Sequence, residues 1–137
     1  MREILFRGKL KNTGEWAFGN LNITTKGTNI ITPDDTPIGK YGAVIPETVG
    51  QYTGLTDKNG TKIFEGDIVK EDDVTHNGQV QIKGGIFEIK MRKGCWVLTE
   101  HKAKDAAWDF LNTFAKTVEV IGNIHDNPEL LKGENDA

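Results

Sequence analysis

Residues 50–70 read GQYTGLTDKNGTKIFEGDIVK, and this stretch decides the fold that the sequence predicts. A strand-like start leads into the turn Asp57-Lys58-Asn59-Gly60, after which apolar residues return. Asn-Gly between apolar runs is a strong hairpin signal, because glycine accepts the left-handed conformation that costs other residues energy. We therefore expect a chain reversal here, followed by a strand that bends at Gly66. Asp67 can accept hydrogen bonds from nearby backbone amides as that bend closes.

The N-terminal part of the chain predicts a β-hairpin over residues 2–23. Ile4 and Phe6 would share one face of the first strand, and Trp16 and Phe18 one face of the second. Aromatic residues at period two are typical of half-buried strands, which favours cross-strand core packing for this pair. The alternative is a stacking surface for a base or a sugar.

Residues 24–50 are rich in glycine and proline and predict a loop interrupted by a brief strand at Ile30-Ile31. Asp34 and Asp35 within it could in principle hold a cation. Two adjacent carboxylates lack the alternate-residue spacing and the turn glycine of a calcium loop, so we predict no metal site here.

The middle of the chain predicts several short strands. Residues 79–83 and 86–91 alternate between polar and apolar side chains, and we expect them to form a two-residue hairpin around Gly84-Gly85. Residues 94–98 would add a further strand.

The period changes to that of a helix at about residue 100. Small and apolar residues then fall on one stripe: Ala103, Ala106, Ala107, Phe110, Leu111 and Phe114. This spacing predicts one substantial helix over about 100–114, packed across the sheet. Trp108 lies off the stripe, so it either anchors a partner subunit or is covered by a second sheet or a loop.

The C-terminal part predicts a returning strand over residues 117–125. A helical turn follows, in which Asn127 would be the cap and Pro128 the first helical residue. Residues 133–137 lack an apolar anchor and form a tail that we expect to fray.

Composition limits the class of protein. The 137 residues include 17 Lys or Arg and 20 Asp or Glu in a mixed order, for a net charge of −3, which disfavours non-specific DNA binding. This length fits one compact domain or two coupled halves. The N-terminus has charges inside its apolar run, unlike a signal peptide, and no apolar run reaches the roughly 18 to 20 residues of a spanning helix. The single cysteine excludes an internal disulfide and suits a reducing, cytosolic compartment.

Motifs for catalysis are missing from the sequence. It contains no phosphate-binding glycine loop, no GxSxG elbow and no HExxH pair. Four residues could carry chemistry but stand alone in sequence, namely His76, His101, His125 and Cys95. The histidines are typical of solvated or hydrogen-bonded residues, and Cys95 of a buried apolar thiol. Glu65 and Asp67 could form a carboxylate pair, but the bend at Gly66 favours a structural role. We therefore predict no catalytic, cofactor-binding or metal-binding residue.

Three segments that lie in order along the chain resemble the YopX family. They are Arg2–Arg7, the central run Gln51–Gly60 with Ile63–Val69, and the closing run Val118–Leu130. Together these segments extend over nearly the whole chain, while residues 71–116 depart most from the family pattern.

The resemblance implies a single domain over residues 1–132. Within it, an SH3-like β-barrel would occupy about residues 51–125. The family consists of small proteins of bacteriophages and prophages, so the resemblance also implies an origin of that kind and a location in the host cytoplasm. It implies no activity and no catalytic residues.

Three functions follow as hypotheses. The leading one is a non-catalytic binding or assembly module that contacts a phage or host protein and self-associates through exposed strand edges. The alternative is specific nucleic-acid binding through a face that carries Lys83, Lys90, Arg92 and Lys93 beside Trp96 and Phe87. The third is an enzyme for a small substrate that uses His125 or Cys95.

Overall fold

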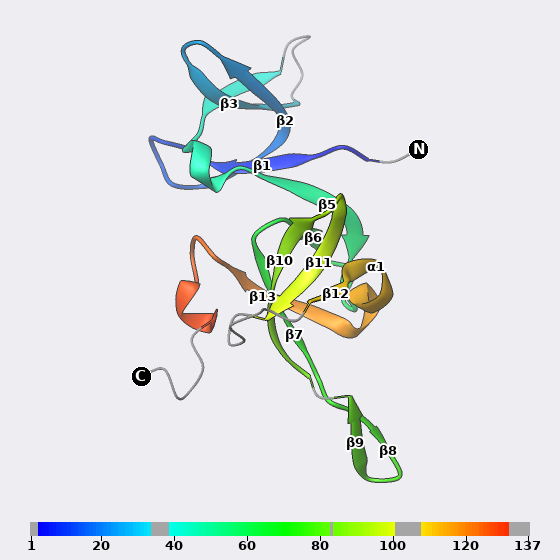
Figure 1. Cartoon of the computed structure of the whole chain (residues 1–137). Helices are drawn as coiled ribbons and strands as arrows, with labels where there is room; N and C mark the ends of the chain where they lie inside the picture. The colour runs from blue at the N-terminus through cyan, green and yellow to red at the C-terminus, as the bar shows by residue number, and fades with distance from the viewer. Residues whose placement is uncertain (1–2, 34–38, 83, 101–107, 132–137) are drawn as a thin grey trace. The chain divides into compact units, whose positions relative to one another are not determined.

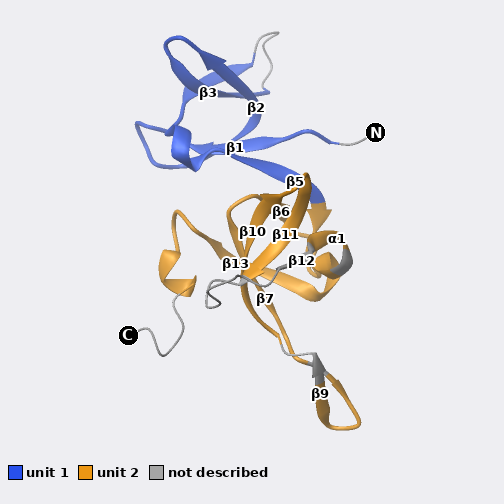
Figure 2. Ribbon diagram, viewed as in Figure 1, with its two compact units in different colours: residues 1–54 blue, residues 55–137 orange. Residues whose placement is uncertain are grey.

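A computed structural model describes residues 3–33, 39–82, 84–100 and 108–131 (Figure 1). The chain divides into two compact units, residues 1–54 and 55–137, which are coloured separately in Figure 2. Both units are built from short antiparallel strands. The α-helix α1 (Leu111–Phe114) has 4 residues and is the longest that the described part of the chain contains. The prediction of a mainly β fold is therefore confirmed.

Unit 1 is a sheet with its strands in the order β4-β3-β2-β1-β5. The strands are β1 (Phe6–Lys9), β2 (Trp16–Thr24), β3 (Gly27–Thr32), β4 (Lys40–Ala43) and β5 (Gly50–Thr56), with the 3-10 helix η1 (Pro46–Thr48) before β5. In the β1–β2 pair, Phe6 is opposite Gly19 and Lys9 is opposite Trp16. The predicted N-terminal hairpin is confirmed.

Strand β2 changes its partner at Gly19. Its pairing with β1 ends there, opposite Phe6, and its pairing with β3 begins at Asn20, opposite Ile31. A Cβ atom at Gly19 would lie 2.0 Å from the carbonyl oxygen of Ile31. The lack of a side chain therefore lets β2 pass from one partner to the other within a single residue.

The end of β1 is tied to the segment that follows β4. Leu10 and Val44 form an isolated antiparallel bridge, and the N–H of Ile45 donates to the carbonyl of Lys9 over 2.9 Å. Ile30 and Val44 are fully buried within this curved sheet. Since burying such side chains contributes about 1.5–3 kcal/mol each, these two residues hold much of the small core of unit 1.

The brief strand predicted at Ile30-Ile31 is confirmed as part of the longer strand β3, but the prediction of a loop is wrong for β4, which is a further strand of the sheet. A tight turn joins β2 to β3: the Thr24 hydroxyl accepts from the N–H of Lys26 at 3.2 Å, and Gly27 has a φ of 140°. Pro33 follows the last residue of β3 instead of interrupting a strand. Asp34, Asp35 and the second proline lie outside the described residues.

Unit 2 contains a five-stranded antiparallel sheet in the order β12-β11-β10-β7-β13. These strands are β7 (Asp67–Glu71), β10 (Gly85–Arg92), β11 (Cys95–Glu100), β12 (Trp108–Phe110) and β13 (Val118–Asn123); β6 (Lys62–Phe64) precedes them. The core joins β6, the sheet, α1 and the 3-10 helix η2 (Ala115–Thr117) through Ile63, Val69, Ile89, Leu98, Leu111, Ala115 and Val118. The sheets are antiparallel and not closed into a barrel, so the SH3-like barrel is not confirmed.

The hairpin predicted for residues 79–91 is wrong. Strand β9 (Gln79–Ile82) pairs with β8 (Val74–His76), whereas β10 pairs with β7 and β11. The reversal lies at Asn77 and Gly78, which have φ values of 53° and 77°. This is the Asn-Gly hairpin turn, which fixes the strand on its N-terminal side as the partner.

The long helix predicted over about 100–114 is wrong for Trp108–Phe110, whereas Leu111–Phe114 is helical, as α1. Residues 101–107 are outside the described ranges, and Trp108–Phe110 is strand β12, paired with β11. The edge of β11 offers unpaired backbone groups to this segment, and its aromatic residues suit a strand. Leu111 and Phe114 do pack against the core, as the stripe indicated.

The C-terminal elements are confirmed, with one correction. Strand β13 is followed by the 3-10 helix η3 (Pro128–Leu131). The N–H of Leu130 donates to the backbone carbonyl of Asn127 over 3.0 Å, while Oδ1 of Asn127 accepts from the N–H of Asn123 over 3.3 Å. The Asn127 side chain thus holds the end of β13 instead of capping η3.

Candidate functional site

Two cations and two aromatic residues share one face of the β1–β2 pair. Arg7 is directly opposite Phe18, and Lys9 is directly opposite Trp16. The guanidinium carbon of Arg7 lies 4.5 Å from the centroid of the Trp16 ring, and Nζ of Lys9 lies 5.6 Å from it. Both are within the distance at which a cation is attracted to an indole ring, which fixes the ring on the sheet.

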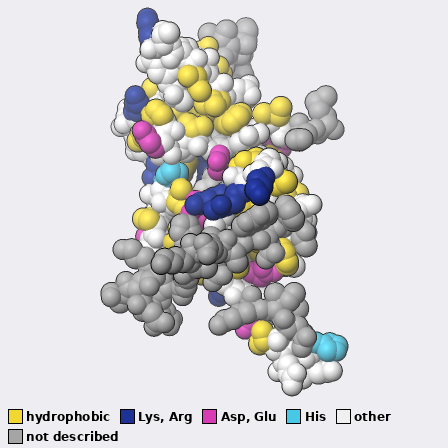
Figure 3. Space-filling view, in the orientation of Figure 1, with side chains coloured by type: hydrophobic (Ala, Val, Ile, Leu, Met, Phe, Trp, Pro, Cys, Tyr) yellow, Lys and Arg dark blue, Asp and Glu magenta, His cyan; other side chains and the backbone are white. Residues whose placement is uncertain are grey.

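The core packing predicted for the aromatic residues of this hairpin is wrong in part. Phe18 is 43% exposed and Ile4 is 64% exposed, while Trp16 is half-buried. Figure 3 shows hydrophobic side chains gathered on the visible face of unit 1. Phe18 and Ile4 are therefore surface residues of unit 1 and do not belong to its core.

Two adjoining hollows lie beside β4, the first facing β2 and the second facing the turn between β1 and β2. The first, the apolar hollow, has a volume of about 270 Å³ and is lined by Leu10, Trp16, Ala17, Phe18, Thr32, Lys40, Tyr41 and Gly42. The second, the polar hollow, has a volume of about 380 Å³ and is lined by Leu10, Lys11, Asn12, Thr13, Glu15, Lys40, Tyr41, Gly42 and Ala43. The two share the residues of β4 and Leu10, and we call them together the unit 1 groove.

Local packing explains the shape of the groove. A Cβ atom at Gly42 would lie 2.5 Å from Cδ2 of Leu10, so the glycine lets the leucine side chain approach β4 closely. The hydroxyl of Thr32 donates to the carbonyl of Phe18 over 3.1 Å and so links the rim of β2 to the end of β3. Tyr41 is 55% exposed at the boundary of the two hollows.

The predicted nucleic-acid face is divided between the two faces of the β10–β11 pair. Trp96 is directly opposite Met91, so it shares a face with Met91 and Phe87, and it packs against the core of unit 2. Lys90 and Arg92 alternate with Met91 and therefore project from the other face. The structure does not place Trp96 beside these cations.

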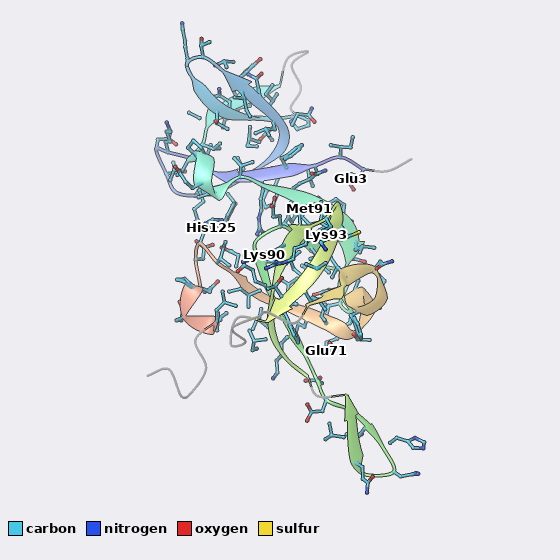
Figure 4. The ribbon with its side chains drawn as sticks, in the orientation of Figure 1. Glu3, Glu71, Lys90, Met91, Lys93 and His125 are labelled. Carbon is cyan, nitrogen blue, oxygen red and sulfur yellow. The ribbon has the colours of Figure 1, made fainter. Side chains whose placement is uncertain are left out.

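The cations themselves gather near the end of β10. Figure 3 shows Lys and Arg side chains together on the visible face of unit 2, and Figure 4 labels Lys90 and Lys93. Lys93 is exposed in the turn to β11 with a φ of 50°. Nζ of Lys90 lies 3.9 Å from the carboxylate of Glu88. Lys83 lies outside the described residues.

Trp108, the predicted partner anchor, lies in β12 opposite Thr99. The structure describes the backbone of this residue and not its side chain. The role of Trp108 at an interface therefore stays a prediction.

The carboxylate of Asp57 is a structural centre of unit 2. Its side chain is 1% exposed, and Oδ1 accepts from the N–H groups of Asn59 and Thr61, both at 2.9 Å. Oδ2 accepts from the N–H of Val120, also at 2.9 Å. Burial raises the pKa of Asp57, but these three hydrogen bonds and the charge of Lys116 outweigh it, so the pKa lies below its ordinary value.

The structural role predicted for Asp67 is confirmed. Its side chain is 2% exposed, and Oδ2 accepts from the N–H of Phe64 over 2.7 Å across the turn. Gly66 has a φ of 88°, as a tight bend at that position requires. The carboxylate closes the bend between β6 and β7.

Residues considered for catalysis are dispersed over the elements. Cys95 is exposed, which contradicts the expectation of a buried apolar thiol. His76 is exposed on β8, His125 is half-buried after β13, and His101 is outside the described ranges. Among the residues whose placement is described, no group of three or more His, Cys, Asp or Glu is arranged to hold a metal ion.

The unit 1 groove contains residues that the sequence did not single out. Lys40 and Tyr41 fall in the segment predicted as a loop, and Leu10 had no assigned role. A four-residue strand is too short to show period-two alternation, so only the aromatic side chain of Tyr41 could have drawn attention to it.

Comparison with known proteins identifies relatives of the whole chain. The family model for the YopX protein matches residues 5–132. The chain is similar to a solved structure, that of protein EF1440 from Enterococcus faecalis, with 29% sequence identity, a TM-score of 0.59, and coverage of 96% of this chain and 99% of that chain. No curated protein matches. In the described part of the chain, every helix is too short or too polar to span a bilayer. Because the family model matches nearly its entire length, the chain belongs to the YopX family.

Proposed function

We propose that this protein is a non-catalytic binding module that contacts a partner protein through the unit 1 groove. One observation carries the proposal: Phe18 and Tyr41 are 43% and 55% exposed on the rim of an open, mostly apolar hollow. Aromatic side chains that line a hollow are the usual energetic centres of protein interfaces.

The lining of the groove favours a protein over a small molecule. The apolar hollow, at about 270 Å³, is slightly smaller than the roughly 300–1,000 Å³ of small-molecule sites, whereas the polar hollow, at about 380 Å³, falls within that range. Such sites also need buried polar groups that orient the ligand. Here the hydroxyl of Thr32 already donates to the Phe18 carbonyl, and the turn residues that line the polar hollow are exposed. One or two side chains of a partner fit this space better than a whole metabolite.

The biological setting of the proposal comes from the family. A phage or prophage origin and action in the host cytoplasm would make a phage or host protein the natural partner. Self-association would be a second use of contact, and an SH3-like arrangement of strands would be compatible with either. An activity as an enzyme is not part of the proposal.

Partner capture tests this function. With the full chain as bait in cells that carry the parent phage or prophage, Phe18→Ala and Tyr41→Ala are each expected to lower recovery of the specific partner tenfold or more, because each removes an exposed anchor. Ile23→Ala is the matched control, since Ile23 is 71% exposed in β2 and does not line the groove. Full recovery with both groove variants would reject the groove as the binding site.

Nucleic-acid binding is the second candidate, and the exposed cations at the end of β10 favour it. Trp96 packs toward the core on the opposite face, so the stacking part of that interface is missing from this surface. We expect no retardation of single-stranded or duplex oligonucleotides in a gel-shift series, even at low ionic strength. Retardation that is abolished by Lys90→Glu with Lys93→Glu would establish the nucleic-acid function instead.

A further inference from the structure

We propose that the occupant of the unit 1 groove is an extended acidic segment with one bulky apolar residue, a deepening that rests on the proposed function. The apolar residue fills the apolar hollow, and neighbouring carboxylates lie over the polar hollow. The two hollows provide the two halves of this recognition.

The apolar hollow accepts the anchor. Phe18 and Tyr41 stand on two strands, β2 and β4, and Leu10 lies over Gly42 with its Cδ2 close to the glycine. An aromatic or leucine side chain placed here would remove from water surfaces that are now exposed. Burial of apolar surface is the dominant favourable contribution to most protein associations, so this side chain is the main source of affinity.

The polar hollow selects the charge of the segment. Of its described lining residues, Lys11 and Lys40 are cationic and exposed, and Glu15 is the one carboxylate. Exposed charges at an interface rim act mainly on partner choice, association rate and salt dependence. The residues at this rim therefore favour an acidic partner.

The geometry suits a short extended segment. The hollows adjoin along β4, which has 4 residues and so spans about 13 Å at roughly 3.3 Å per residue. A segment of about four to six residues can reach both hollows. A nucleic-acid strand also carries negative charge, but Arg7 and Lys9 already lie against the Trp16 ring and limit its use for stacking.

Selection from a displayed library of random dodecapeptides tests the inference. Peptides selected on the immobilised full chain are expected to carry Phe, Trp, Leu or Met flanked by Asp or Glu, with a clear negative shift of mean charge relative to the input library. Neutral or basic selected peptides, or no selection at all, would overturn the inference.

The selected peptide then becomes the probe for variants, measured by fluorescence anisotropy. Phe18→Ala should weaken its binding tenfold or more, and Lys40→Glu with Lys11→Glu about tenfold with a reduced salt dependence. Lys26→Glu is the matched control, since Lys26 is exposed at the turn between β2 and β3, outside the groove. A peptide in which Lys replaces the acidic residues should regain binding on the charge-reversed chain.

The outcomes separate this inference from the proposed function. Phe18→Ala could lower capture of the natural partner while Lys40→Glu with Lys11→Glu leaves peptide binding unchanged. In that case the occupant is not an acidic segment, but the groove remains the binding site. If both Phe18→Ala and Tyr41→Ala leave capture of the natural partner unchanged, the proposed function fails as well. If a thymidine oligonucleotide displaces the bound peptide from the groove, the occupant is nucleic acid and not an acidic segment.

Discussion

Replacing Asp57 by alanine is expected to destabilise unit 2 by about 3 to 5 kcal/mol. The carboxylate is 1% exposed and accepts three backbone N–H groups, from Asn59, Thr61 and Val120. Hydrogen bonds to a charged group are worth roughly 1.5–3 kcal/mol each, and the N–H of Val120 on β13 would lose its acceptor. Folded domains are stable by only about 5–15 kcal/mol, so a loss of this size should be visible throughout the unit.

Hydrogen exchange followed by mass spectrometry measures this effect in the full chain. Peptides from residues 55–82 and 108–131 should exchange much faster in Asp57→Ala than in the unchanged chain. Asp72→Ala is the matched control, because the Asp72 carboxylate lies 3.7 Å from Lys58 with a side chain 72% exposed. Such a surface pair contributes at most about 1 kcal/mol. Equal protection in the two variants would contradict the role given to Asp57.

The same carboxylate predicts how the stability of unit 2 depends on pH. The pKa of Asp57 is lower in the folded chain than the ordinary value of about 3.9. The folded state therefore binds the proton less readily, and the contribution of Asp57 is present above the ordinary pKa and lost as the pH falls from about 5 through the lowered pKa. Urea unfolding at several pH values should show a shallower acid loss in Asp57→Asn, which cannot ionise. An identical acid dependence in both chains would reject this link.

The turns around Asp57 and Asp67 could be predicted because their determinants lie within a few residues. The Asn59-Gly60 pair marks the first reversal, and Gly60 has a φ of 83°. At the second, a carboxylate and the N–H of Phe64 are only three residues apart. What the sequence did not indicate is that Asp57 also binds Val120, 63 residues further along the chain.

Strand pairing was predicted less well because the choice of partner is not local. Residues 79–91 have the alternation of two strands, and Gly84-Gly85 lies between them, so a hairpin was the simplest interpretation. In the structure β9 pairs with β8 across the Asn77-Gly78 turn. Trp108–Phe110 is a strand because it pairs with the edge of β11. Periodicity indicates a strand but does not say which neighbour supplies its hydrogen bonds.

In the candidate site, too, the residues with a local sequence signal could be predicted, and those brought in by distant strand pairing could not. Trp16 and Phe18 stood out in the sequence as an aromatic pair, with core packing and a stacking surface for a base or a sugar as the two interpretations. Their partners in the groove are Leu10 and Tyr41, which are brought together because the end of β1 pairs with the segment after β4. A pairing between residues 34 positions apart is not visible in a local pattern.

Replacing Gly19 by alanine is expected to destabilise unit 1 by about 3 kcal/mol or more and to abolish binding at the unit 1 groove. The new Cβ would lie 2.0 Å from the carbonyl oxygen of Ile31 and 2.7 Å from its carbonyl carbon. Both atoms belong to the backbone of β3, so no side-chain rotation relieves the overlap, and the strands must separate. The pairing of β2 with β3 begins at Asn20, opposite Ile31, so β2 and β3 would separate from the first residue of their pairing onward.

The effect should reach the groove because Phe18 precedes Gly19 and is held by a bond from β3. The hydroxyl of Thr32 donates to the carbonyl of Phe18 over 3.1 Å, and movement of β3 away from β2 would break it. Tyr41 pairs with Ile31 and would move with it, away from Phe18. Loss of the dodecapeptide signal and faster hydrogen exchange over residues 16–32 should therefore occur together.

Asn20→Ala is the matched control for Gly19→Ala, because Asn20 is the next residue of β2 and its side chain is exposed. Its stability should change by no more than about 0.5 kcal/mol, and peptide binding should be retained. The exchange of residues 108–131 should be the same in both variants, which separates a local effect in unit 1 from general unfolding. If Gly19→Ala keeps the exchange protection of β2 and β3, then β2 does not need a glycine to change partners, and this account of how the groove is built is wrong.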